Sequence, residues 1–157
     1  MKNKKEILKR VLVLTLVGGL AFWLANFAIS RTAVAADYRA AMSVSYYPML
    51  LESLIGGLII GLWVSYPLVR FFDWIPAKDP VMKSVFLSSL VLIFVTITLG
   101  GPSSFSATNN VTRYFIIGTV INVIRITALG LAIGWVCKRR YTESHSSDIV
   151  DIPTGLE

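Results

Sequence analysis

The side chains best suited to chemistry in this chain lie within apolar stretches. Arg125 lies near the centre of one stretch, and Glu52 is the single acidic residue inside any of them. A charged side chain at the centre of a membrane costs about 2.5–3.5 kcal/mol, so it should face protein or water. We therefore predict that Arg125 and Glu52 approach each other, with Asn122 and Asn26 completing a polar pocket that opens outward.

Two roles fit these four residues, and the sequence leaves both open. Glu52 and Arg125 could be a structural ion pair that joins two helices. Alternatively, Glu52, Arg125, Asn122 and Asn26 could bind a ligand or an ion, because ionisable residues within membrane helices commonly mark such sites.

The sequence gives little support for catalysis. Its one histidine, His145, lies in a polar tail, and its one cysteine, Cys137, ends an apolar stretch. This spacing predicts no metal site, no base is placed to activate a serine, and the glycine pairs lack a phosphate-loop pattern. We expect no enzymatic activity, no bound metal and no cofactor.

Four apolar stretches must position these residues, and they cover residues 11–29, 48–69, 83–100 and 114–137. A helix of about 20 residues crosses the ~30 Å hydrocarbon layer, where unpaired backbone groups are not tolerated. The predicted fold is an all-α membrane protein with four transmembrane helices arranged as two hairpins. It forms one domain over residues 1–141, and a flexible polar tail follows over residues 142–157.

The composition also points to the lipid bilayer. Of the 157 residues, 55% are hydrophobic and only 15% are charged, and the mean hydropathy is +0.68. A soluble domain is about 45–50% apolar and about 25% charged. The net charge of +6 therefore does not indicate a nucleic-acid partner, because a basic binding face requires a folded soluble surface.

The positive charges predict the orientation of the spans. Eleven of them precede the first stretch, separate the second from the third, or follow the fourth: Lys2, Lys4, Lys5, Lys9, Arg10, Arg70, Lys78, Lys83, Lys138, Arg139 and Arg140. Only Arg31, Arg39 and Arg113 lie on the opposite side. Because cytoplasmic segments are rich in Lys and Arg, both termini are expected in the cytoplasm, as in a multi-pass protein of the cell (inner) membrane.

The N-terminal segment has an alternative interpretation. Its basic start, apolar run and Ala33-Val34-Ala35 also fit a secretory signal peptide with a cleavage site. The run over residues 11–29 is longer than the ~7–15 residues usual in such a signal. We therefore expect residues 1–35 to be retained as the first span.

Small residues at a spacing of four predict close helix packing. Gly57 and Gly61 form one such ridge, and Gly130 and Gly134 form another. Small side chains allow helix backbones to approach in a membrane. The partner helix could belong to the same chain or to a second copy in a homodimer.

Two functions of different classes follow from these patterns. Short loops, packing ridges and the lack of catalytic groups favour a non-catalytic accessory or assembly subunit of a membrane complex. The polar residues Glu52, Asn122 and Arg125 favour the alternative, a small homo-oligomeric transporter or channel. The expected partners are the lipid bilayer and a membrane protein, and the sequence does not identify the substrate or the partner.

Overall fold

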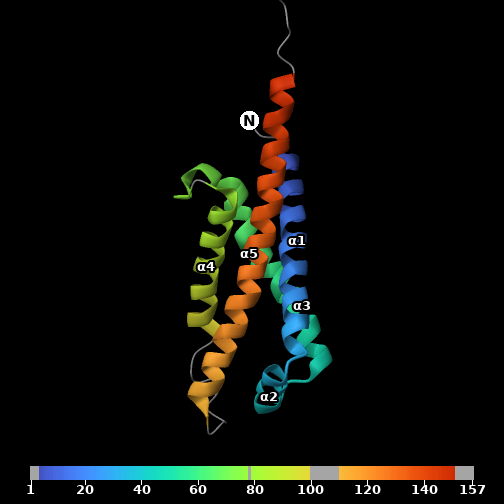
Figure 1. Ribbon diagram of the computed structural model, residues 1–157, viewed down its shortest axis with the longest axis vertical. Helices are drawn as coiled ribbons and strands as arrows, with labels where there is room; N and C mark the ends of the chain where they lie inside the picture. Colours follow the sequence, from blue (N-terminus) through green and yellow to red (C-terminus); the bar gives the residue numbers. More distant parts are fainter. Residues whose placement is uncertain (1–3, 78, 100–109, 151–157) are drawn as a thin grey trace, which may run out of the picture.

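The computed structural model describes residues 4–77, 79–99 and 110–150. These residues form helices and short turns, with no strand among them, so the predicted all-helical class is confirmed for this part of the chain (Figure 1). The helices are α1 (Lys4–Ser30), α2 (Ala33–Ala41), α3 (Tyr46–Arg70), the 3₁₀ helix η1 (Phe72–Trp74), α4 (Pro80–Leu99) and α5 (Val111–Val150).

Three of the described helices are long and apolar enough to cross a membrane. They are Lys4–Ser30, Tyr46–Arg70 and the Val111–Arg139 part of α5, with 27, 25 and 29 residues. Large apolar side chains are exposed along them, as expected for surfaces that meet lipid rather than water. One such row follows α1 at intervals of four residues: Leu12, Leu16, Leu20 and Leu24. The chain is therefore built as a membrane protein.

Four long helices lie side by side, and their directions alternate along the chain (Figure 1). Helix α1 packs most extensively against α3 and also against α5, and α5 packs along α4. We call the end where α2 lies the α2 end, and the opposite end, where η1 lies, the η1 end. The start of α1 lies at the η1 end, and the last turns of α5 project beyond it (Figure 1).

Glycines bring the backbones of α1 and α3 nearly into contact. A Cβ atom added to Gly61 would lie 3.0 Å from the carbonyl oxygen of Thr15, and one added to Gly57 would lie 3.1 Å from that of Gly19. Ordinary contacts of a Cβ atom begin near 3.4 Å. A larger residue at either position would therefore push the two helices apart.

Helix α5 meets α4 in the same manner. A Cβ atom added to Gly134 would lie 2.7 Å from Cα of Val81. One turn earlier, Ser84 donates a hydrogen bond from Oγ to the carbonyl oxygen of Gly130, at 2.8 Å. The polar contact and the small residues fix how far α4 lies from α5.

The core lies where α1, α3 and α5 meet, and it is built from large apolar side chains. Its buried members include Leu14, Phe22, Val64, Leu68, Ile126, Leu129 and Ile133. Burial of an aliphatic side chain in such a close-packed interior excludes lipid from between the helices and fixes their rotation.

A tight corner joins α1 to α2. The hydroxyl of Thr32 donates to the carbonyl of Ile29 at 2.7 Å and accepts from the backbone N–H of Ala35 at 3.3 Å, so it caps α2. Arg39 donates from Nη1 to the carbonyl of Ser30 at 2.9 Å, which satisfies the end of α1. These contacts hold α2 against the end of the bundle.

Helix α5 extends beyond its predicted span and continues through Val150. The flexible tail expected over residues 142–157 stays a prediction. No glycine or proline occurs between Gly134 and Pro153, so nothing in the backbone ends the helix sooner. The predictions on Lys2, Lys78, Gly100 and residues 151–157 fall outside the residues that the structure describes.

Candidate functional site

The candidate site centres on Arg125, which α5 directs toward α1. Its guanidinium carbon lies 5.8 Å from the ring centroid of Phe22, close enough for a cation–π contact. The side chain is half-buried, and its Nε is buried with no hydrogen-bond partner among the residues described. Lone buried donors are uncommon in folded proteins, so this Nε is the first sign of a site.

Tyr38 supplies a second polar group from α2. A Cβ atom added to Gly118 would lie 2.9 Å from the Tyr38 hydroxyl, so the phenol rests directly against the backbone of α5. Gly118 lies two turns before Arg125, and helical side chains lean toward the N-terminus of their helix, so Arg125 extends toward this phenol. Burial raises the pKa of the Tyr38 hydroxyl, and the nearby charge of Arg125 opposes that rise.

Asn26 supplies a third polar group from α1. Its side chain is fully buried, and neither Nδ2 nor Oδ1 has a hydrogen-bond partner among the described residues. One turn before Asn26 on the same helix, Phe22 contacts Arg125. Two turns before it, a Cβ atom added to Gly18 would touch Leu129 and Ile133. Because α1 and α5 run in opposite directions, Asn26 lies level with the turn just before Arg125.

Glu52 does not join this group, and its side chain does not approach Arg125 as the sequence predicted. The Glu52 side chain is exposed, and it makes no ion pair with Arg125. The reason is the rotation of α3. Gly57 and Gly61 face α1, and at 100° per residue Glu52 lies about 140° and 180° around the helix from them. Close packing through small residues therefore turns the carboxylate outward.

The remaining predicted residues occupy separate positions. Asn122 lies one turn before Arg125 on α5 and is half-buried. The packing glycines face neighbouring helices of the same chain, Gly57 and Gly61 toward α1 and Gly130 and Gly134 toward α4. Tyr38 was not predicted as a site residue, because it comes close to Gly118 only when α2 folds back against α5.

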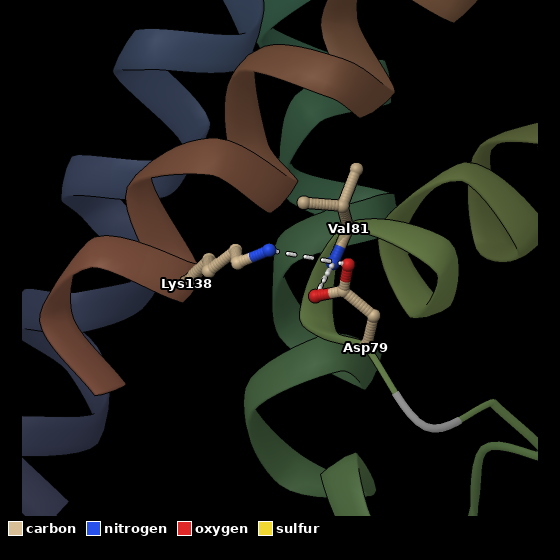
Figure 2. Close-up of polar contacts among 3 residues, drawn as sticks. All are labelled: Asp79, Val81 and Lys138. Carbon is tan, nitrogen blue, oxygen red and sulfur yellow. Dashed lines mark hydrogen bonds and ion pairs between the residues drawn. The ribbon is translucent and has the colours of Figure 1, made fainter. Parts of the chain in front are cut away.

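The described ion pairs lie at the ends of the helices. Figure 2 shows Asp79, whose carboxylate meets Nζ of Lys138 at 3.5 Å and accepts from the backbone N–H of Val81, also at 3.5 Å. At the α2 end, Asp37 pairs with Arg113 at 4.0 Å. Both pairs are largely exposed, so they contribute little stability and leave the interior without a described carboxylate.

Lys83 is a second buried cation that sequence reasoning missed. Only 7% of Lys83 is exposed, and its Nζ donates to the carbonyl of Phe72 and lies 3.9 Å from the centroid of that ring. Lys83, the first residue of the predicted span 83–100, was counted in the sequence only among the charges that set the orientation. In contrast to Arg125 Nε, this cation has a backbone acceptor, and it joins α4 to η1.

Comparison with family models, with curated proteins and with solved structures finds no match to this chain. Within the described residues, no three His, Cys, Asp or Glu side chains gather as a metal site would require.

Proposed function

We propose that this chain is a non-catalytic subunit of a membrane complex and that it binds its partner through the exposed side of α3. The observation that carries the proposal is the exposed carboxylate of Glu52 among exposed apolar side chains. Leu51 and Ile55 are more than half exposed on either side of it. A surface of this kind is suited to lipid except at its one charge.

The depth of Glu52 makes this charge costly in lipid. Helix α3 has 25 residues, about 37 Å at 1.5 Å per residue, so it exceeds the ~30 Å hydrocarbon layer by roughly 4 Å at each end. Glu52 lies six residues after Tyr46, about 9 Å along the axis and therefore about 5 Å inside the layer. A partner with a Lys or Arg side chain at that depth would remove the cost of the unpaired charge.

Gly56 marks where the partner helix would approach. A Cβ atom added to Gly56 would meet nothing within 4 Å, whereas the added atoms at Gly57 and Gly61 would meet α1. Gly56 lies one turn from Glu52 on the exposed side of α3. It is a small residue that packing within the chain does not use, and small residues are where membrane helices approach one another.

The proposal includes four membrane spans with both termini in the cytoplasm. Helix α4 is apolar over Pro80–Val95 and packs along α5, which favours a fourth span beside the three longer ones. Residues 1–35 are proposed to be retained, since α1 contributes Gly19 and Phe22 to the contact with α3. In a background with Cys137→Ser, an impermeant maleimide should label Ser45→Cys on intact cells and label Lys5→Cys only after permeabilisation. The reverse pattern would refute the orientation.

Photocrosslinking tests the binding surface. A photoreactive residue at Gly56 should capture a second membrane protein in native membranes, and one at Leu24, a lipid-exposed position on α1, should not. Glu52→Gln should abolish the capture, while Glu6→Gln, an exposed acidic residue at the other end of the bundle, should leave it intact. Capture of a second copy of this chain would refute a separate partner, and capture that ignores Glu52→Gln would refute the role of the carboxylate.

The alternative function, a small transporter or channel, rests on a different observation. Arg125 holds a charge inside the bundle without a described carboxylate, and such residues mark ion paths in membrane proteins. Because Glu52 faces outward, any path would use Arg125 and Asn122 instead. Anion flux into liposomes that is lost in Arg125→Gln and kept in Glu52→Gln would favour this function, and no flux would exclude it.

A further inference from the structure

A polar group inside the bundle remains after the α3 surface has been assigned, and it consists of Arg125, Asn26 and Tyr38. We infer that these residues bind an oxyanion, a carboxylate or phosphate group carrying a single negative charge, reached from the α2 end of the bundle. The inference is independent of the partner proposed for α3, because it uses α1, α2 and α5.

The first step is the charge of Arg125. Two described carboxylates lie toward the α2 end, and neither is directed to Arg125, since Asp37 meets Arg113 at 4.0 Å and Glu52 is exposed on α3. The contact of Arg125 with Phe22 satisfies the face of the guanidinium but none of its N–H donors. A positive charge in this position favours an anion over a neutral ligand.

The second step is the geometry of the guanidinium donors. The Nε–H of Arg125 is buried and has no partner in the described part of the chain. Together with one Nη–H it forms a fork of two parallel donors, whose spacing matches the two oxygens of a carboxylate or phosphate. A halide would have to share one atom between the two donors, whereas an oxyanion offers one oxygen to each, so the fork favours an oxyanion.

The third step is an independent observation on α1. Asn26 is fully buried, and both polar atoms of its amide lack a partner among the described residues. A buried amide left unpaired is destabilising, and it rarely persists unless a water or a ligand bonds to it. Because Asn26 lies level with the turn before Arg125, its NH₂ group can donate to the same oxyanion that occupies the fork.

The fourth step is the way in. Tyr38 covers this end of α5, where its hydroxyl rests against Gly118, and α2 lies between the polar group and the end of the bundle. The phenol keeps its proton at neutral pH and can donate a hydrogen bond, whereas a phenolate would repel an anion. Helix α2 is joined to α1 by the two-residue turn at Arg31 and Thr32, so a ligand from the α2 end would pass beside α2 and Tyr38.

Isotope-edited NMR of the full chain in detergent micelles tests the inference directly. With ¹⁵N-labelled arginine, the Nε resonance of Arg125, assigned by its loss in Arg125→Lys, should shift and saturate as sodium acetate is added at constant ionic strength. The same titration with sodium chloride should leave the resonance in place. A matched exposed residue, Arg31, should respond to neither salt.

Further titrations identify the source of the oxyanion and keep the test independent of variant folding. Saturation by acetate assigns a soluble carboxylate, and saturation only by micelles containing phosphatidylglycerol assigns a lipid phosphate. Both results support an oxyanion site. Tyr38→Phe and Asn26→Leu should each weaken binding and raise the half-saturation concentration at least threefold. An Nε resonance of the wild-type chain that ignores acetate and phosphatidylglycerol, or that follows chloride equally, would overturn the inference.

Discussion

The contact between α1 and α3 predicts opposite outcomes for two glycines of α3, Gly61 and Gly56. In Gly61→Ala the new methyl group would lie 3.0 Å from the Thr15 carbonyl oxygen and 3.5 Å from the Thr15 Cα, both backbone atoms. In Gly56→Ala the methyl group would meet nothing within 4 Å. Both changes replace glycine by alanine within the same helix, so the gain in helix propensity, about 1 kcal/mol, is common to both.

The difference between the two variants therefore isolates the contact. Because a backbone atom cannot move aside alone, α1 and α3 must separate by roughly 0.4 Å over their length, the gap between 3.0 Å and the ordinary contact distance of 3.4 Å. Overpacking of this kind costs about 1–3 kcal/mol. We expect Gly61→Ala to be less stable than Gly56→Ala by that amount, a change of about 5- to 150-fold in the unfolding equilibrium.

Unfolding of the purified chain in mixed micelles, followed by circular dichroism as the fraction of denaturing detergent rises, measures the difference. Purification without the proposed partner keeps the exposed Gly56 surface from contributing. Gly61→Leu should lower stability further, and Gly56→Leu should not. If Gly61→Ala is as stable as Gly56→Ala, the backbones of α1 and α3 do not meet as described, and the close-packing argument fails.

Three further predictions concern single side chains. Lys83→Met should lower the free energy of unfolding by about 1–3 kcal/mol, because the Phe72 carbonyl loses the Lys83 donor. The control Lys138→Met, at an exposed lysine, should change the free energy of unfolding by less than about 0.5 kcal/mol. Equal effects of the two variants in detergent unfolding would contradict the burial of Lys83. Ser43, which has a positive φ of 52°, should gain about 1 kcal/mol of stability in Ser43→Gly, since a left-handed backbone is strained in other residues; a loss would show that its hydroxyl matters more. Burial raises the folded-state pKa of Tyr38 above its usual 10.0. The contribution of Tyr38 to stability is therefore complete below pH 10 and falls as the pH rises through the folded-state pKa. The melting temperature should decline less between pH 8 and pH 11 in Tyr38→Phe than in the wild-type chain, and identical declines would refute the burial of the Tyr38 hydroxyl.

The helices of this chain are predictable because their signals are local. Long apolar runs determine where α1, α3 and α5 lie, and small residues at a spacing of four mark the sides on which α3 and α5 pack. These signals depend on neighbours within a turn or two, so a single sequence carries them.

The polar site is only partly predictable, because it depends on the rotation of whole helices. Arg125, Asn122 and Asn26 could be identified as polar residues in apolar surroundings. The direction of Glu52 could not be found from charge complementarity, since the preference of Gly57 and Gly61 for close contact decides the rotation of α3. Sequence reasoning that ranks helix packing above ion pairing would have turned Glu52 outward.

Tyr38 and Lys83 were missed for a related reason. Both are ordinary interfacial residues by type, and each becomes significant when a short segment folds back on the bundle, α2 over Gly118 and η1 over α4. Contacts between segments distant in sequence leave no periodic pattern that could reveal them.

The length of α5 has a mechanical consequence. Its 40 residues span about 60 Å, twice the hydrocarbon layer, and its closest approach to the backbone of α4 is at Gly134. Val150 lies about 24 Å beyond that contact and Arg125 about 13 Å before it, on the opposite side. A tilt of about 10° there would carry the projecting end through roughly 4 Å and the level of Arg125 through roughly 2 Å in the opposite sense. Helix α5 thus has the geometry of a lever, with the anion site on its short arm and the projecting end on its long arm.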